Sequence, residues 1–275
     1  MATSQQHLMD VDGLTVAYLD EGQGRPLLLL HGWPTSSFLY RNITPVLAQR
    51  HRVVVPDLPG FGASSKPVDR TYSFELFASV LDALVERLGL DDLGLLVHDL
   101  GGPIGVHWAL HRPGRVSRLA LLNTLLYPDF HPTVVDFVMT LADEDRRHEL
   151  VSEDGLREVL RVGVSHAEAL SDESLDGITA PFTSEEDRRA LAQAGFGLHP
   201  DGFADIARLL PDVQIPVLGL YGSDDTILPD VAETFAHVQR DVPHAQIEAV
   251  PGAGHFLQEE VPSLLAGRLS EFFAR

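Results

Sequence analysis

Short apolar runs alternate with amphipathic segments along the first part of the chain. Near-continuous hydrophobicity over a short run predicts a strand that is buried on both faces, as in a parallel sheet. Four runs have this character: "PLLLLH" (26–31), "HRVVVPD" (51–57), "LGLLVHD" (93–99) and "RLALLN" (118–123). The segments between them have the apolar spacing of helices at 38–50, 72–88 and 102–112. This alternation predicts a mostly parallel, doubly wound α/β sheet.

The alternation stops after Asn123. From 128 to 211 the sequence is helical and charged, and no strand-like run of comparable quality occurs there. Strand patterns return at "IPVLGLYG" and "AQIEAV", each followed by a helical pattern. We therefore predict one core domain, residues 1–127 and 212–275, interrupted by a helical cap domain at 128–211. Such an insertion would cover the carboxyl ends of the strands, where open α/β sheets bind ligands.

Composition narrows the class of protein. The chain has 275 residues, 44% of them hydrophobic, which suffices for a sizeable core. Its 40 acidic and 20 basic residues give a net charge of −20, so nucleic-acid binding is not expected. Without cysteines, disulfides and thiolate metal sites are excluded, and we expect no metal. The start lacks a secretory pattern and no apolar stretch approaches a membrane span, so we expect a soluble, cytoplasmic protein without membrane contact.

Three polar residues follow strand-like runs in the order Asp99, Asp225, His255. Asp99 lies in "LLVHDLGGPIG", where a strand pattern turns tightly into a helix and would present its side chain at the apex. Asp225 lies in "YGSDDTILP" and His255 in the glycine-rich "VPGAGHFLQEE". A nucleophile, an acid and a histidine in this order are typical of α/β-hydrolase triads.

A carboxylate at the apex favours one kind of chemistry. An aspartate with an ordinary pKa near 4 is already ionised at neutral pH and can displace a leaving group from an sp³ carbon. His255, oriented by Asp225, would then activate water against the resulting ester. The oxyanion of that second step needs backbone donors, which we assign to the amides of Leu100 and of Trp33 in "HGWP".

Five motifs in order resemble the haloalkane dehalogenases and, slightly less, the related epoxide hydrolases. They are "HGWPTSSFLYRNITPVLA", "VVVPDLPGFGASSKP", "LLVHDLGGPIG", "LYGSDDTILP" and "GAGHFLQEEVP". The resemblance implies an α/β-hydrolase fold with a helical cap inserted after the sixth strand, an aspartate nucleophile and no cofactor. By matching motifs it assigns catalysis to Asp99, His255 and Asp225, and the oxyanion amides to Trp33 and Leu100.

The leaving-group side of the expected site departs from both families. Haloalkane dehalogenases usually have a halide-binding tryptophan directly after the nucleophile, where this chain has Leu100. Both tryptophans, Trp33 and Trp108, lie outside the predicted cap. Epoxide hydrolases typically use two cap tyrosines, yet residues 128–211 contain none and Tyr127 lies only at the border. We expect Trp33 to be the best surrogate donor or else an apolar pocket wall, followed by Tyr127, His131 and His166.

Three functions remain open on the sequence. The first is a dehalogenase-like hydrolase that forms an Asp99 ester with small neutral apolar substrates, and the runner-up is an epoxide hydrolase. The third is a ligand-binding protein on a catalytically weakened scaffold, suggested by the missing donors. A fluoroacetate-type activity is disfavoured because no arginine follows Asp99 to bind a carboxylate. The expected partner is a small-molecule substrate, and the expected state is a monomer or homodimer.

Overall fold

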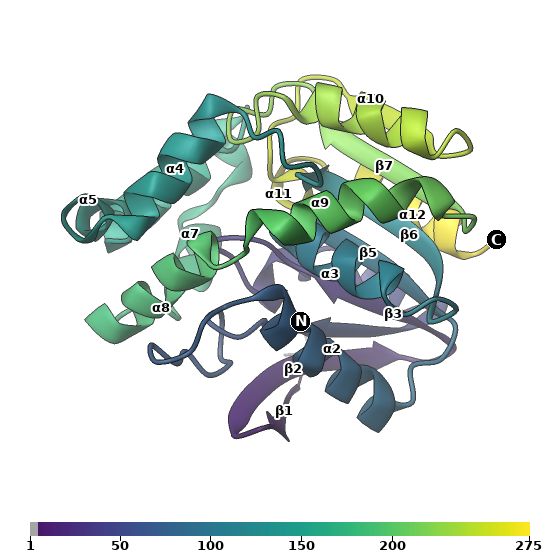
Figure 1. Ribbon diagram of the computed structural model, residues 1–275, viewed down its shortest axis with the longest axis horizontal. Coiled ribbons are helices and arrows are strands. Elements are labelled where there is room, and N and C mark those ends of the chain that lie inside the picture. Colours follow the sequence, from purple (N-terminus) through teal and green to yellow (C-terminus); the bar gives the residue numbers. More distant parts are fainter. Residues whose placement is uncertain (1–4) are drawn as a thin grey trace.

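The computed structural model describes residues 5–275, which form a central eight-stranded sheet covered by helices on both faces (Figure 1). The sheet order is β1-β2-β4-β3-β5-β6-β7-β8. Strands β3 to β8 run parallel to their neighbours, whereas β2 pairs antiparallel with both β1 and β4. The strands are β1 (Gln6–Val11), β2 (Leu14–Gly22), β3 (Arg25–Leu30), β4 (His51–Pro56), β5 (Leu93–Asp99), β6 (Val116–Thr124), β7 (Val217–Gly222) and β8 (Gln246–Val250).

The side chains of the central strands alternate between two apolar layers. In β3, Leu28 and Leu30 join the core on one face, while Leu27 and Leu29 join the core on the other. Burial on both faces explains why these strands are apolar at nearly every position. The first layer packs against α2 (Phe74–Leu88), α3 (Gly101–Leu110) and α10 (Val231–Asp241), and the second against α1 (Thr44–Leu47), α11 (Leu257–Glu260) and α12 (Pro262–Phe273).

The predicted helix at 38–50 is instead two short helices. A 3-10 helix, η1 (Ser37–Tyr40), ends before α1, which begins at Thr44 with Pro45 in its first turn. Proline has no N–H to continue a preceding helix but fits the first turn of a new one. The break therefore follows from one residue within an otherwise helical pattern.

Between β6 and β7 the chain forms only helices. They are α4 (Pro132–Ala142), α5 (Glu144–Leu150), α6 (Glu153–Val162), η2 (Ala167–Ala169), α7 (Asp172–Thr179), α8 (Glu185–Phe196), α9 (Pro200–Leu209) and η3 (Leu210–Asp212). Serine side chains cap the starts of α6, α7 and α8, which satisfies backbone amides that a helix start leaves free.

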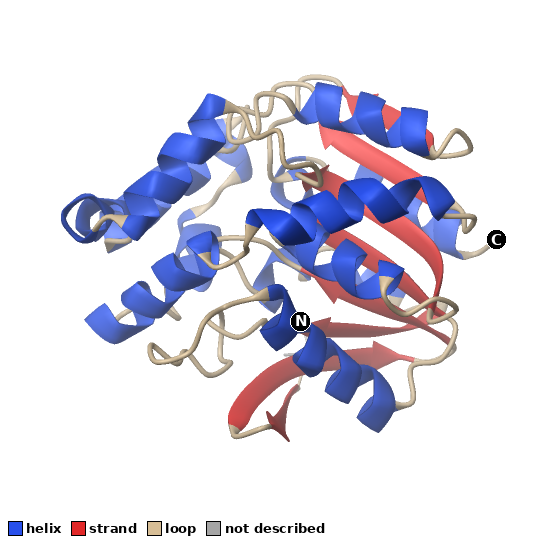
Figure 2. Ribbon diagram, viewed as in Figure 1, coloured by secondary structure: helices blue, strands red, loops and turns tan. Residues whose placement is uncertain are grey.

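The helices between β6 and β7 are not one packing unit. Figure 1 and Figure 2 show α4, α5, α7 and α8 beyond the carboxyl ends of the parallel strands, where α4 packs against α5 and α8. By contrast α9 lies along α3, on the face of the sheet. The fold class expected from the sequence, an α/β-hydrolase sheet with helices inserted after the sixth strand, is confirmed. In residues 5–275, no helix has both the length and the apolar character that a membrane crossing requires.

Candidate active site

Asp99 lies at a tight turn between β5 and α3. Its φ of 49° is in the left-handed region, which non-glycine residues seldom adopt and which turns the carboxyl group away from the strand. The opposite wall of the turn is Gly32, where a Cβ would lie 2.2 Å from Asp99 Oδ1. Only glycine fits there, so the backbone of the β3–η1 loop closely approaches the carboxylate.

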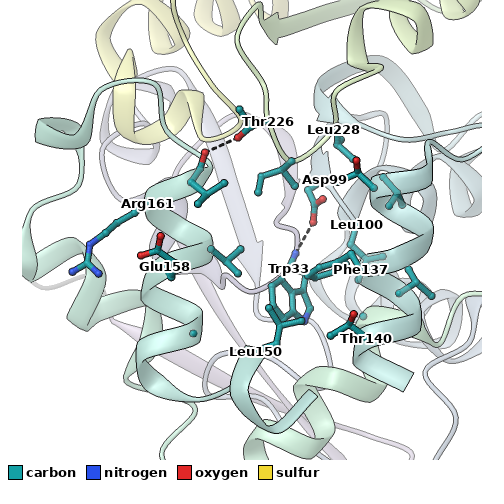
Figure 3. A pocket seen from close by; sticks show the side chains of 18 of the residues that line it. Trp33, Asp99, Leu100, Phe137, Thr140, Leu150, Glu158, Arg161, Thr226 and Leu228 are labelled. Carbon is teal, nitrogen blue, oxygen red and sulfur yellow. Dashed lines mark hydrogen bonds between the residues drawn. The ribbon is translucent and has the colours of Figure 1, made fainter. Parts of the chain in front are cut away.

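Two backbone amides hold one side of this carboxylate. The amide of Trp33 donates to Asp99 Oδ1 at 2.7 Å, and the amide of Leu100 also hydrogen-bonds to the carboxyl group. Figure 3 shows the Trp33 bond within the surrounding cavity. These are the two amides that the sequence assigned to oxyanion binding. Their dipoles favour negative charge on the carboxylate, and the Trp33 amide acts on Oδ1.

The other carboxylate oxygen faces a histidine. His255 Nε2 lies 3.6 Å from Asp99 Oδ2, and His255 Nδ1 lies 2.9 Å from Asp225 Oδ2. Because a carboxylate only accepts, the Nδ1–H donates to Asp225 and leaves Nε2 unprotonated in the neutral ring. Nε2 is buried and has no hydrogen-bond partner among the described residues. The structure thus brings the three predicted polar residues together, although 125 residues lie between Asp99 and Asp225 in the sequence.

Asp225 is held by four donors. Its Oδ1 accepts the amides of Ile227 and Leu228, both at 2.8 Å. Its Oδ2 accepts Nδ2 of Asn123 at 2.8 Å in addition to the His255 ring. Sequence reasoning did not single out Asn123, although it ends the "RLALLN" run, where a polar residue follows a buried strand. The same signal had drawn attention to Asp99 and Asp225.

Burial and neighbouring charges shift the pKa values of Asp225, His255 and Asp99, and the shift at Asp225 favours its ionised form. Burial opposes ionisation of Asp225, but the His255 charge and the hydrogen bonds from His255 and Asn123 outweigh it and lower its pKa. Burial likewise opposes protonation of His255, yet the Asp225 carboxylate raises the pKa of that ring above 6.5. For Asp99 burial dominates and raises the pKa above 3.8, although His255 and the two amides oppose the rise.

The loops that carry His255 and Asp225 are both tied to the end of α6. His255 N donates to Gly163 O at 2.7 Å, and Thr226 Oγ1 donates to Val162 O at 2.6 Å. Glu260 adds a further tie, since it accepts the amide of Gly254 at 2.6 Å and those of Ser165 and His166 at 2.8 and 3.1 Å. The position of the inserted helices is therefore coupled to that of the histidine, through contacts that the sequence motifs did not indicate.

Asp99 opens into a cavity of about 1090 Å³ between the sheet and the inserted helices (Figure 3). Its buried or half-buried apolar lining includes Leu100, Leu125, Phe137, Leu228 and Phe256. The charged lining residues are exposed and form the rim of the cavity: Arg146, Glu149, Asp154, Glu158 and Arg161. An apolar interior with a carboxylate at its end suits a neutral apolar ligand.

Trp33 forms a wall of this cavity. Its indole Nε1–H donates to the backbone oxygen of Leu191 in α8 at 3.1 Å, and its rings meet Phe137 edge-on at 4.8 Å. The N–H is thus engaged by the inserted helices. Two roles were considered for Trp33, and this geometry fits the apolar wall. As a halide donor Trp33 would need a free N–H, but its N–H is bonded to Leu191 instead.

The other three candidate leaving-group residues do not line the cavity. The hydroxyl of Tyr127 donates to Asp241 at 3.0 Å, and its ring stacks on His237 outside the site. His131 caps the start of α4 by accepting the amide of Thr133. His166 is exposed. Leu125, Thr133 and Val134 in the same stretch do line the cavity, so Tyr127 and His131 are kept out by the direction of their side chains.

Comparison with known proteins agrees with this geometry. The family model described as alpha/beta hydrolase fold matches residues 25–262. A cis-3-alkyl-4-alkyloxetan-2-one decarboxylase from Shewanella oneidensis is 30% identical over 98% of this chain and 88% of its own. A haloalkane dehalogenase 2 from Mycobacterium bovis is 31% identical over 94% of this chain and 91% of its own. The solved structure of the epoxide hydrolase CorEH superposes with a TM-score of 0.86 at 26% identity, covering 99% of both chains.

The fold and these relatives define a class of enzyme, the α/β hydrolases. Within it, the chain belongs to the group that contains the haloalkane dehalogenases and epoxide hydrolases, and it is a hydrolase.

Proposed function

We propose that this hydrolase works through a covalent ester on Asp99 and that its substrates are small, neutral and apolar. The observation that carries the proposal is the position of Asp99 between two amide donors and His255, at the end of an apolar cavity. In the first step the carboxylate attacks an sp³ carbon and expels the leaving group. Because Oδ1 accepts the Trp33 amide, Oδ2, which faces His255, is the attacking oxygen.

The second step hydrolyses the ester. A water molecule that gives its proton to His255 Nε2 attacks the ester carbonyl carbon, and the amides of Trp33 and Leu100 stabilise the oxyanion. The buried Asp225 stabilises the imidazolium that forms. Collapse of the intermediate releases the alcohol and restores the Asp99 carboxylate.

We assign the leaving group to a halide, as in the dehalogenase-named relatives, with a preference for bromide and iodide over chloride. The side-chain donors in the buried and half-buried lining are all engaged: the Trp33 N–H bonds to Leu191 O, and the hydroxyls of Thr140 and Ser152 donate to backbone oxygens. Each absent charge-assisted hydrogen bond costs about 1.5–3 kcal/mol, or roughly tenfold to a hundredfold in rate. A better leaving group suffers least from this loss.

Epoxide opening, the runner-up on the sequence, is less well supported. Attack on an epoxide leaves an alkoxide, which needs a proton donor, and no tyrosine lines the cavity. A carboxylate leaving group is a stronger second candidate because it spreads its own charge over two oxygens. Attack on the sp³ ring carbon of an oxetan-2-one releases such a group, and one relative is named for acting on these rings.

The helices α4 to α8 would serve as the cap that excludes water during the first step. We propose residues 128–211 as the cap domain, in which α4 to α8 form the cover and α9 leads back along α3, and residues 1–127 and 212–275 as the core domain. The wall formed by Phe137 and by Trp33, which is bonded to Leu191, supports this role, because it joins α4 and α8 directly to the site.

The test uses His255→Ala, which leaves Asp99 free to attack but removes the base for hydrolysis. The variant and the unaltered protein are incubated with chloro-, bromo- and iodohexane, styrene oxide and a dialkyl oxetan-2-one, and intact masses are recorded. We expect the variant to gain one alkyl group from the halides, mapped to the peptide with Asp99. His148→Ala, which replaces an exposed histidine on α5, is the matched control and should turn over without accumulating adduct.

An active protein whose His255 variant never accumulates adduct would disprove the covalent mechanism. Adduct from the lactone but none from any halide would replace halide by carboxylate as the leaving group. The product then distinguishes a hydroxy acid, formed by hydrolysis of the ester, from an alkene formed with loss of carbon dioxide. Adduct from styrene oxide alone would show that the enzyme opens epoxides rather than cleaving carbon–halogen bonds.

A further inference from the structure

His107 on α3, His111 at the C-cap of α3 and Asp205 on α9 lie close together, away from the cavity. His107 and His111 lie one helical turn apart, so their rings are on the same side of α3, with centroids 4.2 Å apart. Asp205 Oδ2, on the neighbouring α9, lies 3.9 Å from His111 Nε2. One possible ligand atom from each of the three residues lies within 4.8 Å of the others.

These side chains have the chemistry of metal ligands. Imidazole nitrogens with one carboxylate oxygen form a donor set that suits Zn²⁺ and its neighbours in the transition series, and histidines four residues apart on a helix are a recurring source of two such nitrogens. The ring of His107 forms no hydrogen bond in residues 5–275, and its Nδ1 is buried. Burial and the neighbouring His111 lower the pKa of His107, which keeps the ring neutral, as ligation requires.

The surrounding charges leave this group available. Arg208 binds Asp205 Oδ1 at 2.7 Å, which orients the carboxylate while its Oδ2 faces His111. Arg112 is engaged with Asp82 at 2.5 Å. Glu75 acts on His107 from the start of α2, and the chain as a whole carries a net charge of −20, both of which favour a cation.

We propose that His107, His111 and Asp205 form a binding site for a divalent transition-metal ion such as Zn²⁺, which would join α3 to α9. Small rotations of the three side chains bring their donor atoms to the distances that Zn²⁺ requires, about 2.0–2.2 Å from the ion. Because the ligands come from two helices, the ion binds the folded chain in preference to the unfolded one and stabilises it. α9 is the helix through which the chain returns from the inserted helices to β7, so the ion would fasten that return.

The experiment titrates the untagged full-length chain with Zn²⁺ by calorimetry and with Co²⁺ by visible absorption, which reports on nitrogen and oxygen ligation directly. We expect one ion per chain and a rise in Tm of roughly 5 °C at a hundredfold excess over Kd. His111→Ala and Asp205→Asn should each weaken binding by about tenfold or more. Both residues are partly exposed, so the variants should fold, and the Tm without metal verifies this.

The matched control is His148→Ala, which removes an exposed histidine elsewhere and should leave the affinity unchanged. Absence of saturable binding would overturn the proposal, as would binding that neither site variant weakens. If only His111→Ala weakens binding, the ion is held without α9 and the joining of the two helices is wrong. If only Asp205→Asn does so, the histidine pair is not a ligand and the proposal fails as well.

Discussion

The two sides of the cavity are built in different ways. On the Asp99 side, most polar groups have fixed partners: two amides on Asp99, four donors on Asp225, and a backbone tie from His255 to Gly163, while His255 Nε2 is left without one. On the opposite side, formed by α4, α6 and the ring of Trp33, the interior is apolar and its charged residues are at the rim. The protein therefore fixes the attacking group closely and leaves the departing group largely to the substrate.

The difference follows from where each side comes from in the fold. Asp99, Asn123 and Asp225 lie at or just after the carboxyl ends of the adjacent parallel strands β5, β6 and β7. The hydrogen-bonded sheet leaves these positions little room to move. The apolar side belongs to the inserted helices, whose polar ties go to the loops of His255 and Asp225 and to Trp33 rather than into the cavity. Residues at the carboxyl ends of the strands can hold oxygen atoms within a fraction of an ångström. The inserted helices chiefly determine the shape of the cavity and exclude water from it.

The largest expected effect comes from removing the carboxylate itself. Asp99→Ala should lower turnover of bromohexane by about 10⁴-fold or more and abolish the covalent adduct, because no other group can attack. Stopped-flow halide release and intact mass measure the two effects. The Tm should change little, because the loss of the hydrogen bonds to Asp99 is offset by no longer burying a carboxylate. Residual turnover close to that of the unaltered protein would mean that the reaction does not take place at Asp99.

Adding a donor to the apolar side tests the other half of the comparison. Leu100→Trp places an indole N–H beside Asp99 and should raise bromide release by roughly tenfold, the value of one charge-assisted hydrogen bond. Leu100→Phe is the matched control, because it fills similar space without an N–H and should give no gain. Equal rates for the two variants, with both folded, would argue against a halide as the leaving group.

The pH profile should separate the two steps. The second step needs a neutral His255, whose pKa is raised above 6.5, so ester hydrolysis should fall about tenfold per pH unit below that pKa. The first step needs an ionised Asp99, whose pKa is raised from 3.8, so alkylation should fail only at more acidic pH. Adduct should therefore accumulate in the unaltered protein at mildly acidic pH and disappear as the pH rises. A profile in which the adduct is greatest at alkaline pH would contradict these assignments.

The smallest effect on rate is expected for Trp33→Phe. Its indole N–H is bonded to Leu191 O, so the change should alter bromide release by less than about threefold. The lost bond should instead cost about 1 kcal/mol of stability, visible as a Tm lower by a few degrees. A tenfold or larger fall in rate at unchanged Tm would show that the indole donates to the halide. The apolar side of the cavity would then contain a hydrogen-bond donor for the leaving group.

The order of elements in the core was readable from the sequence, but not all of the sheet. The runs at 26–31, 51–57, 93–99 and 118–123 correspond to β3, β4, β5 and β6. The hairpin of β1 and β2 was not anticipated, because β1 alternates exposed and half-buried positions and lacks a continuous apolar run. It is an edge hairpin, and only strands buried on both faces carry the stronger pattern.

The sequence by itself determined which residues are brought to the carboxyl edge of the sheet. Asp99 and Asp225 lie at or just after the carboxyl ends of the buried strands β5 and β7, and His255 follows the edge strand β8; a parallel sheet brings the carboxyl ends of its strands to the same side. Only the tertiary structure decided how the remaining side chains are used. The indole of Trp33 turns to Leu191, Glu260 joins the His255 loop to α6, and the carboxylate of Asp205 turns to His111. These partners are distant in sequence and carry no periodic signal, because a hydrogen bond between two surfaces depends on how the helices dock rather than on either segment alone.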